Sequence, residues 1–164
     1  MDNIVAETIA TLVGIFVGTL AALLMDRRNE QRRLRQRART VLRSLAQELS
    51  ENYKTIKDAK PAYVSTPWGK SFYVSTVAWE TALSSGDLPD IIGFELTDAI
   101  SAQYALLTRI RYYVNLLTQL WFAPNDVAGY EKMQQGFNRA IVEAMSQAIS
   151  QHTALVGQIE KTMR

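Results

Sequence analysis

Apolar residues recur at helical spacing along most of this chain, and the first group of them is uninterrupted. From Thr8 to Met25 the sequence reads TIATLVGIFVGTLAALLM, eighteen residues without a charged side chain. A helix of that length spans roughly 27 Å, close to the hydrocarbon thickness of a bilayer. The pattern predicts a single transmembrane helix.

A cleaved signal peptide and a buried helix of a globular protein are the two other interpretations of this segment. A signal peptide carries basic residues before its apolar run, whereas here Asp2 and Glu7 precede the run and Arg27 and Arg28 follow it. A buried helix would have to be covered on every side, which a small domain cannot easily do. We therefore expect a membrane anchor.

Small residues recur every four positions within the predicted anchor. A stripe of this kind lets a second helix approach closely, and close packing is a main source of helix association in lipid. Glycine and alanine are also common in membrane helices without any such role. We expect the stripe to support a homo-oligomer; its members are Ala10, Gly14, Gly18 and Ala22.

The helix is expected to continue beyond the membrane. Neither glycine nor proline occurs between Thr19 and Lys60, so we predict one helix from about Thr8 to about Ala59. Apolar positions in its second part partly repeat after eleven residues, which favours a straight or slightly right-handed bundle. This seam consists of Leu34, Ala38, Leu42, Leu45, Leu49, Tyr53 and Ile56.

Charge is segregated along the chain. Residues 1–25 contain two acids and no base, residues 26–43 contain eight arginines and two acids, and residues 44–164 contain twelve acids and ten bases. These ranges are the predicted anchor, juxtamembrane helix and helical bundle. We therefore expect the protein in the cell (inner) membrane. By the positive-inside rule, the bundle is expected in the cytoplasm and the N-terminus outside.

The arginines after the anchor have three interpretations. Those nearest the membrane are expected to contact anionic lipid or another polyanion, and the later ones either pair with acids of the bundle or form a basic surface. No recognised motif for nucleic-acid binding accompanies them, so nucleic acid is not an expected partner. The predicted contact residues are Arg27, Arg28, Arg32, Arg33 and Arg35. The run continues with Arg37, Arg39 and Arg43.

The remaining sequence predicts an all-α antiparallel bundle of about four helices. A loop is expected at 61–69, where two prolines and a glycine occur, and a turn at 87–93. Helices are predicted at about 71–85, 94–122 and 127–163. Gly86 is placed to end the first of these. Their predicted core positions include Val74, Trp79, Ala82, Leu83, Leu96, Ile100, Gln103, Leu107, Ile110, Val114, Leu117, Trp121, Met133, Phe137, Ile141, Met145, Ile149, Val156 and Ile159.

Two short motifs carry a resemblance. Residues 45–52 read LAQELSEN and residues 79–88 read WETALSSGDL. With the anchor and arginine run before them, they resemble a group of small uncharacterised prokaryotic single-pass membrane proteins that share LxxELxxN and WxxxLxSGxL segments. The resemblance implies the same layout and no activity. Glu48 and Asn52, one turn apart, are expected to bond to the Trp79 helix-turn.

Candidate chemistry is sparse. Cysteine is absent, which excludes disulfides and thiolate ligands or nucleophiles. His152 is the single histidine and lies among apolar residues, where a core-edge role is favoured over a base or metal ligand. No paired acids or glycine-rich phosphate motifs occur. We expect no enzyme activity, catalytic residue, metal or cofactor.

An aromatic cluster follows the long helix and has two interpretations. It is either core or the lining of a ligand pocket that a cytosolic signal molecule could reach. The residues of the possible pocket are Lys60, Tyr63, Trp68, Lys70 and Tyr73.

Together these features favour a membrane-anchored, self-associating interaction or scaffold module that holds an unknown protein partner at the cytoplasmic face. The alternative is a ligand-gated membrane effector, for example in signalling or phage defence, whose bundle senses a cytosolic molecule and acts through a membrane oligomer. It would require two conformations of similar free energy.

Overall fold

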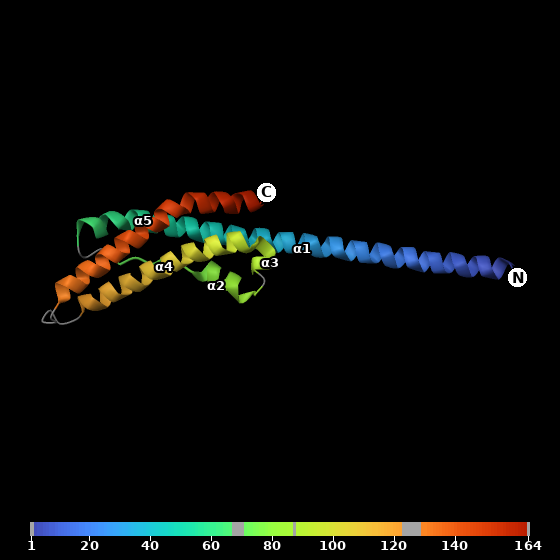
Figure 1. The fold of residues 1–164 in the computed structure, drawn as a ribbon, viewed down its shortest axis with the longest axis horizontal. Helices are drawn as coiled ribbons and strands as arrows, with labels where there is room; N and C mark the ends of the chain where they lie inside the picture. The colour runs from blue at the N-terminus through green and yellow to red at the C-terminus, as the bar shows by residue number, and fades with distance from the viewer. Residues whose placement is uncertain (1, 67–70, 87, 123–128, 164) are drawn as a thin grey trace. The chain divides into compact units, whose positions relative to one another are not determined.

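The chain folds into helices, with no strand in the residues that the structure describes (Figure 1). The computed structural model describes residues 2–66, 71–86, 88–122 and 129–163, with side chains from Gly14 onward. The predicted all-α class is confirmed. Within those ranges the helices are α1 (Asp2–Ser65), α2 (Val77–Ser84), α3 (Leu88–Ile92), α4 (Phe94–Trp121) and α5 (Tyr130–Met163).

The chain divides into two compact units, Met1–Ala38 and Arg39–Arg164. The first unit is helical from Asp2 and is the N-terminal part of α1. Its large hydrophobic side chains are between 50% and 70% exposed over the stretch where they can be described. They are Ile15, Phe16, Val17, Leu20, Leu23, Leu24 and Met25.

Over the described residues, no helix combines the length and the apolar character needed to cross a membrane. The side chains of residues 8–13, the first third of the predicted anchor, lie outside the described set. The predicted membrane span therefore stays a prediction.

The second unit is a helical bundle, as predicted. Helices α4 and α5 run antiparallel and lie side by side (Figure 1). Gln103, only 3% exposed, donates from Nε2 to the carbonyl oxygen of Ala148 at 3.0 Å and so joins the two helices. The seam predicted for α4 is buried from Leu96 to Leu117. In α5, Ile141, Met145 and Ile159 are buried as predicted.

The part of α1 within this unit contributes its own buried face. Leu42, Leu45, Leu49 and Ile56 are each at most 1% exposed. Tyr53 stacks on His152 of α5 with ring centroids 4.2 Å apart. Most of the predicted seam is therefore the surface that α1 presents to the bundle.

Helix α1 is longer than predicted and passes through Pro61. The predicted loop at 61–69 is therefore wrong over its first five residues. Proline forfeits one helical hydrogen bond and crowds the preceding turn. Tertiary packing offsets this cost, because Tyr63 is 1% exposed, contacts Phe72 edge-on at 5.8 Å and accepts at its carbonyl oxygen from Asn138 of α5.

The helix predicted at 71–85 begins only at Val77. Residues before it are not helical, and their side chains alternate: Tyr73 is 66% exposed, while Val74 and Thr76 are 1% and 4% exposed. Asn52 of α1 donates to the carbonyl oxygen of Ser75 at 2.7 Å and accepts from its amide at 2.8 Å. These bonds replace those that a helix would make there.

Smaller corrections concern the turn and the edges of the core. The predicted turn at 87–93 contains the short helix α3, and α5 begins at Tyr130, with Val127 outside the described residues. Gly86 has φ +73° and ends α2 as predicted. Four predicted core residues are instead 46% to 58% exposed because they lie at element ends or edges. They are Leu34, Leu83, Trp121 and Met133.

Candidate functional site: a groove between α1 and α2

Glu48 is a buried carboxylate that joins α1 to two other helices. It is 7% exposed. Its Oε2 accepts from the Ser75 hydroxyl at 2.6 Å and from the Ala78 amide at 2.9 Å, and its Oε1 accepts from the Tyr104 hydroxyl at 2.6 Å. Bonds of this kind to an ionised group are among the stronger ones in proteins. Glu48 therefore fixes the start of α2 against α1 and α4.

The carboxylate also takes the place of an N-cap. Thr76, the residue at the N-cap of α2, makes no capping side-chain bond; its hydroxyl donates to Glu80 at 2.6 Å and accepts from Arg111 at 3.1 Å. The first amides of a helix need acceptors, and their partial positive charge favours an anion. Glu48 meets both needs from another helix.

The surroundings of Glu48 act on its pKa in opposite directions. Burial raises it, whereas hydrogen bonds from Ser75, Tyr104 and the amides of Ala78 and Trp79 lower it, and the net pKa lies below its ordinary value. Burial, together with the bond to Glu48 and its charge, raises the pKa of the Tyr104 hydroxyl. The pair therefore consists of a carboxylate and a neutral phenol at neutral pH.

Glu48 bonds to the Trp79 helix as expected, but at its first turn rather than at the turn that follows it, whereas Asn52 bonds to Ser75, which precedes the helix. Trp79 itself stacks on Tyr104 with centroids 5.2 Å apart and an interplanar angle of 9°. Because the Trp79 amide also donates to the Glu48 carboxylate, the two sequence motifs meet in space. The four-residue spacing of Glu48 and Asn52 in the sequence indicated that both side chains lie on one face of α1. The sequence did not indicate that Ser75 is their shared partner.

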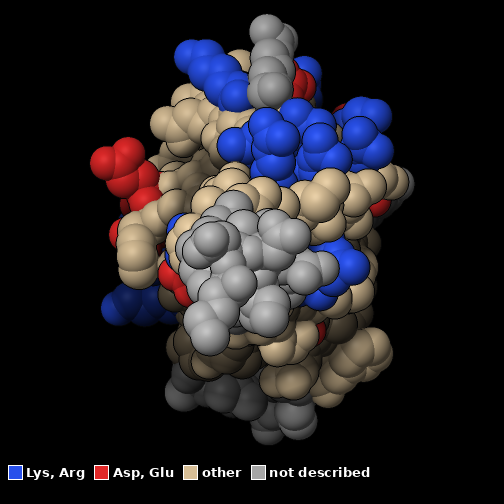
Figure 2. All heavy atoms as spheres, turned by 90° about the vertical axis from the view of Figure 1, so that its right-hand side faces the viewer, with Lys and Arg blue, Asp and Glu red and all other residues tan. Residues whose placement is uncertain are grey.

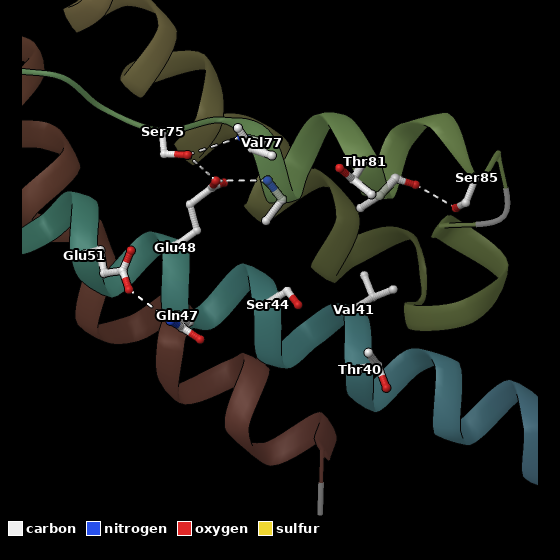
Figure 3. A pocket seen from close by; sticks show the side chains of 12 residues that line it. Thr40, Val41, Ser44, Gln47, Glu48, Glu51, Ser75, Val77, Thr81 and Ser85 are labelled. Atoms are coloured by element: carbon white, nitrogen blue, oxygen red, sulfur yellow. Dashed lines mark hydrogen bonds between the residues drawn. The ribbon is translucent and has the colours of Figure 1, made fainter.

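A groove of about 560 Å³ lies between α1 and α2 beside this network (Figure 3). One wall is the face of α1 from Thr40 to Glu51, and the other is Ser75 together with α2 and its C-terminal Ser85. Glu51 accepts from Gln47 at 3.0 Å on the α1 side. Sequence patterns did not predict this groove, because its walls come from segments about thirty residues apart. Its lining residues are Thr40, Val41, Ser44, Gln47, Glu48, Glu51, Ser75, Val77, Ala78, Thr81, Ala82 and Ser85.

The predicted lipid or polyanion contacts, Arg27, Arg28, Arg32, Arg33 and Arg35, are all exposed. On the face drawn in Figure 2, basic side chains gather beside uncharged surface. Gly14 and Gly18 of the predicted packing stripe have open space around them, since a methyl group added at either would meet no atom within 4 Å. Ala22 is exposed, and the side chain of Ala10 lies outside the described residues.

The residues of the predicted ligand pocket have different surroundings. Tyr63 is a core residue at 1% exposure, and burial raises its pKa to about 12. Tyr73 is 66% exposed and Lys60 is half-buried. Trp68 and Lys70 lie outside the described residues. None of the three described residues lines the α1–α2 groove.

His152 lies at the edge of the core, as its apolar neighbours indicated. It is 9% exposed, and burial lowers its pKa. Its buried Nδ1 has no hydrogen-bond partner among the described residues. The same part of the chain contains no group of three or more His, Cys, Asp or Glu residues arranged to hold a metal ion.

No protein-family model matches the sequence, and comparison with curated proteins and with solved structures found no significant similarity. The resemblance through the LxxELxxN and WxxxLxSGxL segments therefore stays a prediction.

Proposed function

We propose that the chain is a membrane-anchored, self-associating helical module that holds a protein partner at the cytoplasmic face of the cell membrane. The observation that supports this most is the continuity of α1. One helix, Asp2–Ser65, contains the uncharged run, the arginines and the buried seam of the bundle. Anchoring would confine the bundle to two dimensions and raise its effective concentration without any new contact.

The exposed apolar side chains in the N-terminal part of α1 support the anchor. Large hydrophobic residues from Ile15 to Met25 are at least half exposed. A contiguous apolar surface of this kind is typical of sites that contact lipid or another protein. The uncharged sequence extends N-terminally to Thr8, which gives eighteen residues in all. A bilayer is the covering that this length fits best.

The exposed arginines support the proposed orientation. They follow the apolar run directly, and no base precedes it. Basic residues near anionic headgroups contribute about 1 kcal/mol each within a Debye length of the surface. This asymmetry favours a cytoplasmic bundle and an external N-terminus.

Self-association is proposed through Gly14 and Gly18, which have room for a second helix. The test is the oligomeric state of the full chain in detergent, measured by light scattering. Gly14→Leu with Gly18→Leu should shift the protein to monomers, because leucine prevents close approach of the backbones. Phe16→Leu, on the opposite side of the helix, is the control. A double variant with unchanged oligomeric state would contradict self-association through this stripe.

The anchor itself is tested by membrane fractionation. The full chain should stay with membranes after alkaline extraction, and replacement of Ile15 and Leu20 by aspartate should release it, because charges in a bilayer core are costly. A wild-type chain that is released by the same extraction would contradict the anchor.

A ligand-gated membrane effector is the second candidate, and the α1–α2 groove favours it. The groove has the volume of a small-molecule site. Replacing the anchor with a foreign transmembrane helix separates the two candidates. A module that only holds its partner at the membrane, which we call a tether, keeps its function after this exchange. An effector that acts through its own membrane oligomer loses its function.

A further inference from the structure

The groove between α1 and α2 has the size of a ligand site and an uneven lining. Small-molecule pockets are commonly about 300 to 1,000 Å³, and this groove of about 560 Å³ lies in that range. Its α1 wall, from Thr40 to Glu51, is about 16 Å long. The shape suits a narrow, elongated molecule.

The polar lining is rich in acceptors and acidic. Hydroxyl groups come from both walls, and two carboxylates, Glu48 and Glu51, come from positions three apart on α1, which share a helix face. None of the residues lining this described groove is a lysine or an arginine. The lining hydroxyls belong to Thr40, Ser44, Ser75, Thr81 and Ser85.

The two ends of the groove both favour positive charge. At one end, the partners of Glu48 are neutral hydroxyls and an amide, so its charge there is stabilised by dipoles and not by a cation. At the other end lie Ser85, the C-cap of α2, and Thr81 (Figure 3). The last carbonyls of α2 accept from Ser84, Ser85 and Gly86, so the lining hydroxyl oxygens of Thr81 and Ser85 are the acceptors that a cation would meet there.

Apolar side chains line the groove along both walls. Val41 lies on the α1 wall and Ala82 on the α2 wall, and Val77 and Ala78 lie at the end of α2 nearer to Glu48. Methylene groups gain from leaving water against such side chains. An occupant with cationic ends and an aliphatic middle therefore matches the groove throughout its length.

We propose that this groove binds a linear aliphatic polyamine, with one ammonium near Glu48 and Glu51, a second near Thr81 and Ser85, and the methylene chain between the walls. The inference goes beyond the proposed tether, because binding here needs neither the membrane nor self-association. It names the class of ligand that the second candidate function requires.

The test is calorimetric titration of the full chain in non-ionic detergent at low salt with spermidine as the probe. We expect saturable binding that weakens as salt is raised. Butylamine, with one charge, should bind more weakly than spermidine, and 1,4-butanediol and glutarate should not bind. Absence of spermidine binding, or preferential binding of glutarate, would overturn the proposal. If the groove instead binds a helix of a second copy of the chain, spermidine will not bind.

Variants locate the site. Glu51→Gln should weaken spermidine binding about fivefold, since one partly solvated charge pair is lost, while Glu95→Gln, an exposed acid of α4 outside the groove, should have no effect. Thr81→Arg places a cation in the groove and should abolish binding. Thr81→Met adds similar bulk without charge and should bind better than Thr81→Arg. Binding unchanged in both Glu51→Gln and Thr81→Arg would place the polyamine elsewhere and refute the site.

These variants keep the outcomes separable from folding and from the tether. Glu51 and Thr81 are exposed, and neither bonds to the Glu48 network. Helical circular dichroism checks that each variant is folded. If spermidine does not bind, the results of membrane extraction and of the oligomeric-state measurement are unaffected. If the chain is not anchored or does not self-associate, the result of the spermidine titration is unaffected.

Discussion

Helix α1 carries leucines in two stretches with different surroundings. Leu20, Leu23 and Leu24 are 50% to 59% exposed, whereas Leu42 and Leu45, later in the same helix, are at most 1% exposed. The first stretch belongs to the unit Met1–Ala38 and the second to the bundle. The residue type and the secondary structure are the same in both, so these alone do not decide burial.

The difference lies in the polar residues that accompany each stretch. The buried leucines are followed in the same helix by Glu48 and Asn52, whose bonds to Ser75, Ala78 and Tyr104 align α1 with α2 and α4. The exposed stretch is uncharged, and among its described side chains, from Gly14 to Met25, only Thr19 makes a hydrogen bond, to the carbonyl oxygen of Ile15 in the same helix at 2.8 Å. Directional hydrogen bonds therefore specify how α1 contacts the bundle. The apolar stretch is suited to surroundings that offer no hydrogen-bond partners, such as lipid.

The largest effect is expected from truncating one leucine in each stretch. Leu45→Ala should lower the free energy of unfolding by about 2 to 5 kcal/mol, because it leaves a cavity in the core. Leu24→Ala should change it by less than about 0.5 kcal/mol. Urea denaturation of the full chain in non-ionic detergent, followed by tryptophan fluorescence, measures both. Equal losses in the two variants would show that the first stretch is also packed under these conditions.

A smaller loss is expected when only the charge of Glu48 is removed. Glu48→Gln keeps the shape but turns an acceptor into an amide donor against Ser75, Ala78 or Tyr104, so about 1 to 3 kcal/mol of stability should be lost. Glu143→Gln, an exposed acid on α5, is the matched control. The same denaturation assay applies. A loss no greater than that of the control would mean that the Glu48 network does not specify the bundle contact.

The smallest effect concerns pH and the Tyr53–His152 stack, with Lys57 above the Tyr53 ring at 5.7 Å. Burial lowers the pKa of His152 below its ordinary 6.5. Just below pH 6.5, His152 binds a proton in the unfolded chain but not in the folded chain. Its contribution to the free energy of unfolding is therefore fully present above pH 6.5 and is lost as the pH falls towards the folded-state pKa. His152→Phe keeps the ring and should make stability less dependent on pH.

Denaturation midpoints between about pH 7.5 and about pH 5.5 provide the measurement. This window lies above the range in which Glu48 contributes: its lowered pKa gives stability that is present above its ordinary 4.5 and is lost as pH falls through the folded-state pKa. A wild-type chain with the same pH dependence as His152→Phe would show that His152 titrates equally in both states.

Local pattern was sufficient to predict the helical class, the long first helix, the seam of α4 and most of the seam of α1. Leu42, Leu45, Leu49 and Ile56 were predicted from their spacing and are buried. Such periodicity reports which residues share one face of a helix, and within the bundle that face packs against the neighbouring helices. Gly86 was predicted for a similar local reason, because positive φ favours glycine.

Tertiary contacts decided the features that local pattern misplaced. Pro61 stays within α1 because Tyr63 is packed beyond it, and α2 starts late because Asn52 occupies the amide and carbonyl of Ser75. The groove depends on the approach of two segments that are distant in sequence. Each of these outcomes is a competition between a local preference of a few kcal/mol and contacts of similar size made across the fold, and only the folded chain shows which prevails.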